Sequence, residues 1–131
     1  MHKYTFPAVF TEEENGQYSV EFPDIDGCAT CGDDLNDAIE MAQDALSLML
    51  CEYEDSKEKI PTPTKISDIK VTNGEFVSLI ACDTVQYRKQ LDKGEVTRVI
   101  TIPAWLNVLV EKTDIDCSAL LKKELMKEFG F

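Results

Sequence analysis

The sequence predicts an α+β protein of 131 residues in two parts, a front domain of order β-β-β-α-β and a back domain of order β-α-α. In the front part, alternating apolar residues mark strands, and a helical repeat lies between the third strand and the fourth. The last 36 residues read as a strand, a proline and two amphipathic helices. Charge separates the parts as well, because residues 1–83 carry −13, residues 84–95 carry +1 and residues 96–131 are neutral.

The front domain begins with two strands joined by a tight turn. Residues 4–10 alternate, with Tyr4, Phe6, Ala8 and Phe10 on one face of a strand and Thr5, Pro7 and Val9 on the other. Asn15-Gly16 is a strong hairpin turn, because both residue types tolerate positive φ. Residues 18–22 alternate again and form the second strand, and a short third strand is expected at residues 29–31.

One helix and one further strand complete the front domain. Asp33 is the expected N-cap, and the helix should run to about Tyr53. Residues 54–65 are polar and form a loop, and the continuous apolar run from Phe76 to Cys82 indicates a buried strand. The apolar side of the helix repeats at helical spacing and contains small residues, among them Ala38, Ala42 and Ala45.

The back domain is too short to fold alone. Residues 96–102 form a lone strand, Pro103 follows it, and 36 residues seldom bury enough apolar surface for stability. A lone strand also leaves a row of unpaired main-chain groups. A twin chain solves both problems, with two antiparallel strands over four interlocked helices. This is the ribbon-helix-helix arrangement, whose paired strands can enter the DNA major groove. We therefore expect an obligate homodimer through residues 96–131, with a higher oligomer as the alternative.

Strand parity separates a DNA face from a dimer core. Thr97, Val99 and Thr101 share one face and are the expected base-reading residues, since threonine can bond several bases and valine can touch a thymine methyl. The alternative is a strand that only dimerises. The opposite face and the two helices supply the expected dimer core, which comprises Ile100, Ile102, Leu106, Leu120, Leu121 and Leu125.

The second helix of the back domain should begin after Asp116, a good N-cap. In ribbon-helix-helix folds the start of this helix grips DNA phosphate through free N–H groups and its positive dipole end. Cys117 and Ser118 are therefore the expected phosphate-binding residues. The negative charge of Asp116 opposes a phosphate at this position.

Composition argues against a membrane protein and against metal or redox chemistry. No apolar run is long enough to span a bilayer, and the N-terminus lacks a signal-peptide core, so we expect a cytoplasmic protein. Five cysteines fit reduced thiols, and Cys28-x-x-Cys31 lacks the second pair or histidine cluster that zinc needs, since His2 is the only histidine. With no nucleophile–base arrangement visible, we expect no cofactor, no metal, no catalytic residue and no enzymatic activity.

The acidic front domain should attract a basic protein. Charge alone points to exposed acids as contacts, although a solvated acidic face explains each one equally well. The clustered acids Asp24, Asp26, Asp33, Asp34 and Asp37 fall mostly in turn or cap positions, which explain aspartate without catalysis. The candidate partner-binding acids are Glu12, Glu13, Glu14, Asp37, Glu40 and Asp44.

Three segments resemble one known family. Residues 22–33, Phe-Pro-Asp-Ile-Asp-Gly-Cys-Ala-Thr-Cys-Gly-Asp, resemble the F-P-D-x-x-G-C-x-T-x-G-D signature of HicB-family antitoxins. The small-residue helix follows at the family's position. Residues 83–88 (Asp-Thr-Val-Gln-Tyr-Arg) and residues 101–107 (Thr-Ile-Pro-Ala-Trp-Leu-Asn) match too, so order and spacing agree over nearly the whole chain.

The resemblance implies an antitoxin of a type II toxin–antitoxin pair. Its front domain would have a partial ribonuclease-H-like fold without an active site, and would bind and block HicA, a small basic RNA-cleaving toxin. Its back domain would be a ribbon-helix-helix that represses its own operon by binding operator DNA. The family often has lysine in place of Thr97 and a polar residue in place of Val99, so DNA reading here is weaker or differently specific.

Three other functions stay open at this stage. The first is a stand-alone DNA-binding transcriptional regulator without a toxin partner. The second is an enzyme with a degenerate nuclease fold, which metal-dependent RNA cleavage would reveal. The third is a purely structural dimer, which fails if operator binding depends on Thr97 and Thr101.

Overall fold

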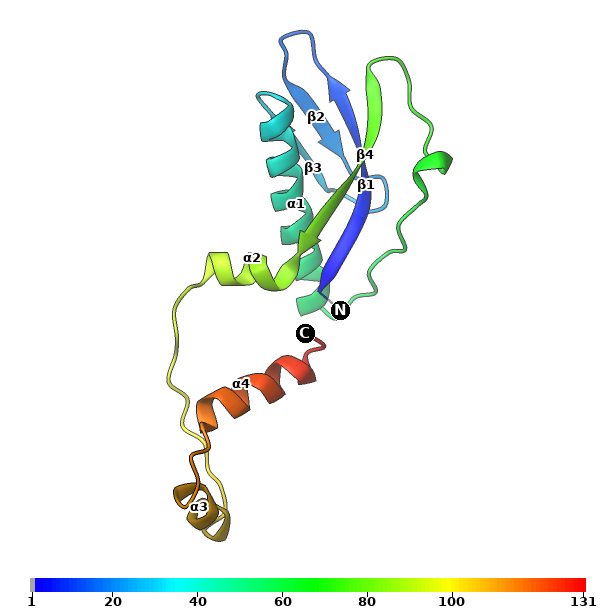
Figure 1. Cartoon of the computed structure of the whole chain (residues 1–131). Coiled ribbons are helices and arrows are strands. Elements are labelled where there is room, and N and C mark those ends of the chain that lie inside the picture. Colours follow the sequence, from blue (N-terminus) through cyan, green and yellow to red (C-terminus); the bar gives the residue numbers. More distant parts are fainter. Residues whose placement is uncertain (1) are drawn as a thin grey trace. The chain divides into compact units, whose positions relative to one another are not determined.

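A computed structural model describes residues 2–131 of the chain (Figure 1). Its internal packing divides into a front unit of residues 2–91 and a back unit of residues 92–131. The front unit contains a four-stranded sheet and the longest helix, and the back unit contains two short helices. The α+β class predicted from the sequence is confirmed.

The front unit is built on one antiparallel sheet. Its strands are β1 (Lys3–Glu12), β2 (Tyr18–Glu21), β3 (Ala29–Gly32) and β4 (Glu75–Asp83). They lie in the order β3-β2-β1-β4, so the last strand of the sequence pairs with the first. Three strands before the helix and one after it were predicted, and this element order is confirmed.

Helix α1 (Leu35–Asp55) covers one face of the sheet and starts one residue later than predicted. Its N-cap is Asp34, whose side chain accepts from the N–H of Asp37, so the prediction of Asp33 was wrong. The side chain of Asp37 in turn accepts from the N–H of Asp33 at 2.8 Å. With three aspartates in this turn, only the backbone decides which one caps, and Asp34 has the extended conformation that a cap requires.

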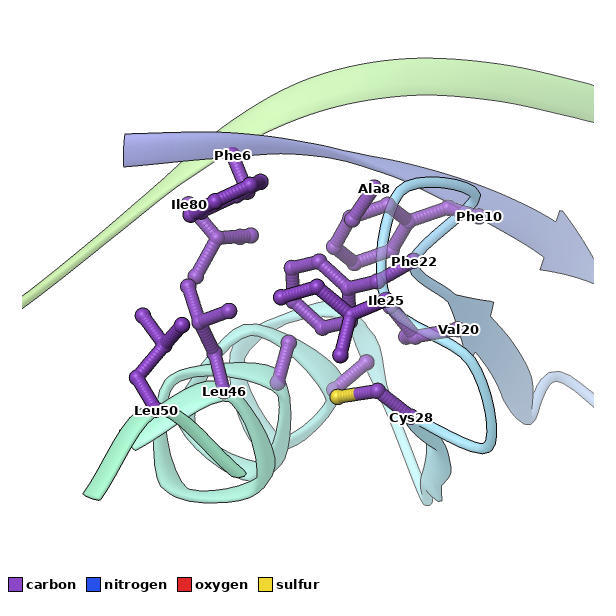
Figure 2. Packing of buried hydrophobic residues seen from close by; sticks show 12 residues of the cluster. Phe6, Ala8, Phe10, Val20, Phe22, Ile25, Cys28, Leu46, Leu50 and Ile80 are labelled. Atoms are coloured by element: carbon purple, nitrogen blue, oxygen red, sulfur yellow. The ribbon is translucent and has the colours of Figure 1, made fainter. Parts of the chain in front are cut away.

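The core lies between the sheet and α1 (Figure 2). Three aromatic rings, Phe6, Phe10 and Phe22, fill its centre and are at most 2% exposed. Two alanines of α1, Ala38 and Ala42, are fully buried, and their small size lets the helix approach the sheet closely. The remaining buried members are Ala8, Val20, Ile25, Cys28, Leu46, Leu50 and Ile80.

Strand β4 is an edge strand, which corrects the prediction of a fully buried one. Only Ile80 is buried, while Phe76 is 39% exposed and Leu79 is 53% exposed. The side chains of Phe76 and Ile80 face α1, whereas Leu79 lies opposite Pro7 on the other face. An apolar run on both faces fits a central strand equally well, so the sequence pattern could not reveal that β4 lies at the border of the sheet.

The segment between α1 and β4 is attached to the turn after β2 by side-chain hydrogen bonds. It contains the short 3-10 helix η1 (Ile66–Asp68) and otherwise lacks regular structure. The N–H and hydroxyl of Thr64 both donate to the carboxylate of Asp24. Asp24 belongs to the turn after β2, so this acid has a structural task that explains its place in the turn.

Residues 84–95, which the sequence predicts as a linker or short helix between the domains, are partly helical, since α2 (Thr84–Leu91) follows β4 directly. The back unit contains α3 (Ala104–Glu111) and α4 (Cys117–Glu128), which agree with the two predicted helices. Residues 92–103 have no regular secondary structure, and the predicted strand at residues 96–102 is not formed in the single chain. A strand needs a second strand to pair with, so this element stays a prediction for the dimer.

Candidate functional site

The front unit has an open groove of about 660 Å³ where α1, α2 and the paired ends of β1 and β4 meet. Three acids line it, namely Glu40 and Asp44 of α1 and Asp83 of β4, against one cation, Lys3. Two aromatic rings, three glutamines and four small residues complete the lining. The groove is therefore acidic, and suits a cationic or hydrogen-bonding side chain of a partner.

Helical spacing places the two α1 acids together. Glu40 and Asp44 are four residues apart and so share one side of the helix, where both are exposed. Between them Gln43 donates from Nε2 to the main-chain oxygen of Ala81 at 3.2 Å, which fixes α1 against β4 beside the groove. The acids thus stand on a rigid wall of the groove.

A carboxylate network fixes the wall formed by α2. Glu54 accepts from the hydroxyls of Tyr4 at 2.8 Å and Thr84 at 2.9 Å. Arg88 of α2 donates to Glu54 at 3.1 Å and to Asp55 at 2.9 Å. Burial, followed by the hydrogen bond to Glu54, raises the pKa of Tyr4. These contacts hold α2 against the end of α1, so that α2 forms one wall of the groove.

Sequence reasoning did not find Glu54 or Arg88. They are 34 residues apart, and neither stands in a pattern that marks a site. The only signal was the segment of residues 83–88, which ends with Arg88 and carries Thr84.

The predicted partner-binding acids do not form one cluster. Glu40 and Asp44 line the groove, whereas Asp37 helps to cap α1. Glu12 and Glu13 lie at the far end of β1, where Glu13 accepts from the hydroxyl of Ser19 at 2.9 Å. Only the pair on α1 therefore stands beside the groove.

None of residues 92–131, all of which the structure describes, is buried. Large apolar side chains of this back unit are exposed, including Val99 at 93% and Trp105 at 68%. The predicted dimer-core residues are open too, with Ile100, Ile102, Leu106, Leu120 and Leu125 between 36% and 53% exposed and Leu121 half-buried. A unit of this kind has no hydrophobic core of its own.

The predicted DNA-binding residues lie on two segments of the back unit. Thr97, Val99 and Thr101 are exposed in the irregular segment before α3. Cys117 and Ser118 begin α4, whose predicted N-cap Asp116 is confirmed by its bond from the N–H of Ala119 at 3.1 Å. That bond occupies one of the N–H groups that could otherwise face a phosphate.

Residues of both segments line one hollow of about 730 Å³. Thr97 and Ser118 both line it, with Arg98 and Lys122 beside them and apolar side chains of α4 behind. Val99, Thr101 and Cys117 do not line the hollow. Its lining combines two cations and the acid Glu95 with apolar side chains.

Some cysteines are buried and others lie at the surface. All five are free within the described part of the chain. Cys28 belongs to the core and Cys31 is exposed, and burial raises the pKa of Cys28 and of Cys82 to about 11. Residues 2–131 contain no group of three or more potential metal ligands close enough to hold an ion, and no helix among them could cross a membrane.

An acidic unit with an open groove, joined to a small unit without a core, has the surfaces of a two-part binding protein. The chain belongs to the HicB-like antitoxins of bacterial toxin–antitoxin systems, whose family model matches residues 6–124. The resemblance carried by residues 22–33 is therefore confirmed at the level of the family.

Curated relatives and solved structures agree with this assignment. The chain is 41% identical to antitoxin HicB 2 of Photorhabdus laumondii over 125 residues, which cover 79% of this chain and 89% of the relative. It is 28% identical to antitoxin HicB of Escherichia coli K12, with 95% and 96% covered.

The fold is also similar to solved structures at low identity. A chain of a toxin–antitoxin complex from Streptococcus pneumoniae has a TM-score of 0.63 at 20% identity, with 96% of this chain and 99% of that chain covered. The antitoxin HicB of Burkholderia pseudomallei has a TM-score of 0.55 at 20% identity, with 95% and 98% covered. At this identity the likeness concerns the fold.

Proposed function

We propose that this chain neutralises a HicA-like ribonuclease toxin by binding it through the front domain, residues 1–83. The observation that carries the proposal is the acidic groove, where Glu40, Asp44 and Asp83 face a single lysine in a domain of net charge −13. A partner that binds RNA presents basic side chains, which this groove suits. The sheet-and-helix unit would act as a partial ribonuclease-H-like scaffold, and the complex would form in the cytoplasm.

Charge would act mainly on the rate of association. An acidic surface attracts a basic partner over a distance, and salt screens that attraction. Association should therefore be fast at low ionic strength and slower at high ionic strength. Contacts inside the groove would then fix the partner's orientation, because its walls are held by Gln43 and by the Glu54 network.

The first test is co-purification. The tagged chain is co-expressed with the small protein encoded beside it, and the complex is assayed for RNA cleavage. A stoichiometric, inactive complex is the expected result. Absence of a complex with a well-folded neighbour would refute the antitoxin role for this pair and favour a stand-alone DNA-binding regulator.

A charge-matched pair of variants tests the groove itself. Glu40→Gln/Asp44→Asn should slow toxin association about tenfold at low salt, because it removes two charges from the groove wall. Glu12→Gln/Glu14→Gln removes the same charge at the hairpin, and should have a much smaller effect. Equal slowing in both variants would refute the groove as the contact and leave only net charge.

We also propose that the back domain forms a ribbon-helix-helix dimer that represses its own operon. The proposal is supported by the absence of any buried residue in 92–131, where apolar side chains stay open in the single chain. Pairing of residues 96–102 with their symmetry mates would satisfy the main chain and cover Ile100, Ile102 and Leu125.

In the dimer, Thr97, Val99 and Thr101 would read base edges, with Cys117 and Ser118 near phosphate. Thr97 and Ser118 already line one hollow with Arg98 and Lys122, which supports a shared contact. Thr97→Ala/Thr101→Ala should abolish binding to the promoter DNA of this chain while the dimer persists. Unchanged DNA binding would refute base reading by this strand.

A further inference from the structure

Strand β4 has an open hydrogen-bonding edge. It pairs only with β1, in the register Lys3 to Asp83 through Thr11 to Glu75. The N–H of Thr84 donates to His2 and that of Glu12 to Gly74, so the even-numbered residues of β4 exchange bonds with β1. The main-chain groups of Val77, Leu79 and Ala81 therefore point away from the sheet.

Within residues 2–131, η1 contacts β4, and some of the outward main-chain groups of β4 already have partners. The main-chain oxygen of Ala81 accepts from Gln43, and the N–H of Glu75 donates to Thr72. In the described part of the chain no hydrogen bond reaches the outward main-chain groups of Val77 or Leu79. The side chain of Leu79 is 53% exposed beside them.

The sequence of β4 lacks the features that commonly prevent edge pairing. Proteins protect edge strands with proline, lysine, bulges or short length. Residues 75–83 are nine in number, contain no proline, lysine or glycine, and pair with β1 in continuous register. Such an edge is suited to the addition of a further strand.

Charge argues against a second copy of this chain as that strand. Antiparallel pairing of two β4 strands around Leu79 would set Glu75 of one copy opposite Asp83 of the other. Like charges directly opposite are destabilising, and the whole domain carries −13. The strand that fits is therefore one from a basic protein.

The acidic groove continues this edge. Ala81 and Asp83 are at once the last part of β4 and part of the groove lining, next to Glu40 and Asp44. A strand laid along β4 with basic side chains at its ends would meet Glu75 at one end and the groove acids at the other. Apolar side chains in between would cover Val77 and Leu79.

We propose that the toxin partner extends the sheet, adding a strand with basic ends along the open edge of β4. This inference rests on the proposed antitoxin function, and it specifies the mode of binding. Main-chain hydrogen bonds would supply affinity, and the flanking acids would select a basic strand.

A pair of variants at Leu79 tests the inference. Leu79→Pro removes the outward N–H without removing a bond to β1, and proline is tolerated on the open side of an edge strand. Leu79→Ala removes the same side chain but keeps the N–H. With both variants folded by circular dichroism, Leu79→Pro should bind the toxin roughly tenfold more weakly than Leu79→Ala, as expected for one or two lost main-chain bonds. Equal affinities would overturn the inference.

Hydrogen exchange of the unmodified full chain gives a second test that needs no variant. The amides of Val77 and Leu79 should exchange rapidly in the free protein and at least about tenfold more slowly in the toxin complex. A complex that forms without protecting these amides overturns strand addition but leaves the antitoxin role intact. Failure of the unmodified chain to form any complex overturns the antitoxin role itself, and strand addition with it.

Discussion

The hydroxyl of Tyr4 donates a hydrogen bond of 2.8 Å to Glu54, joining the first strand to the last turn of α1. Thr84 donates to the same oxygen of Glu54, and Arg88 donates to the other. The Glu54 side chain is only 12% exposed, so it depends on these partners for solvation. One carboxylate therefore links β1, α1 and α2, and keeps the groove walls together.

Removing this carboxylate should destabilise the front unit more than removing one of its donors. Glu54→Ala removes the acceptor of the Tyr4 hydroxyl and the buried charge beside Arg88, while Thr84 can still donate to the main-chain oxygen of His2 and Arg88 to that of Cys51. The free energy of unfolding should therefore fall by about 2 kcal/mol. Tyr4→Phe removes one bond and should cost about 1 kcal/mol. Urea unfolding followed by circular dichroism measures both changes.

Asp55 provides the control for the Glu54 variant. It also pairs with Arg88, at 2.9 Å, but its side chain is 66% exposed. Asp55→Ala should therefore change the free energy of unfolding by no more than about 1 kcal/mol, as for a surface ion pair. Equal losses for Asp55→Ala and Glu54→Ala would contradict a central role of the buried carboxylate.

Gly32 should be intolerant of any side chain. A Cβ at this position would lie 2.3 Å from the main-chain nitrogen of Ala38, in the first turn of α1. Gly32→Ala should lower the free energy of unfolding by about 3 kcal/mol, because the backbone must shift to relieve the overlap. The shift would separate α1 from β3, and thermal unfolding would detect the loss.

Gly16 distinguishes crowding from backbone strain. It has a φ of +85° in the hairpin turn, but a Cβ there would meet no atom within 4 Å. Gly16→Ala should therefore cost only about 1 kcal/mol, the penalty of a left-handed conformation. If Gly16→Ala proves as destabilising as Gly32→Ala, close packing of the helix on the sheet is not the reason for glycine at position 32.

Local patterns were sufficient to predict the elements of the front domain. Strand β1 alternates because only its Tyr4–Phe10 face meets α1, and α1 repeats at helical spacing because one side of it covers the sheet. The Asn15-Gly16 turn fixes the hairpin between β1 and β2. These features depend on neighbours in sequence, so the sequence alone reveals them.

Features that depend on distant residues could not be predicted in this way. The apolar run at Phe76–Cys82 predicts a strand but not its neighbours, so the pattern favours a buried strand although β4 lies at the edge of the sheet. The groove joins residues 3, 40 and 83, which no spacing connects. The Glu54 network likewise joins three elements, and only the folded sheet shows that Tyr4 and Arg88 meet there.

Adjacent residues of the proposed back-domain strand face opposite sides, so they are predicted to have different roles. Ile100 is assigned to the proposed dimer core and Val99 to the proposed DNA face. Ile100→Asp should dissociate the dimer, because it would bury an unpaired charge between the two chains. Val99→Asp adds the same charge on the opposite face and should leave the dimer intact.

Sedimentation and DNA-binding measurements together distinguish the two variants. Ile100→Asp should sediment as a monomer and lose operator binding as a consequence. Val99→Asp should sediment as a dimer yet bind operator DNA weakly, since its carboxylate would face phosphates and base edges. Dimers in both variants, or monomers in both, would contradict the assigned parity.

Alkaline pH should weaken the front unit through its buried thiols. Burial raises the pKa of Cys28 and of Cys82 from 9.0 to about 11. In the unfolded chain these thiols regain the ordinary value and lose their protons at lower pH than in the folded state. The folded state therefore holds more protons between pH 9 and 11, and the free energy of unfolding falls as pH rises through this window.

Two cysteine variants test whether a buried thiol causes this fall in the free energy of unfolding with pH. Urea unfolding across the same window should show a shallower pH dependence for Cys28→Ala than for the unmodified chain, because one titrating group is gone. Cys31→Ala, at an exposed position of the neighbouring strand, should keep the full slope. If Cys28→Ala and the unmodified chain lose stability in parallel, the alkaline weakening does not arise from the buried thiol of Cys28.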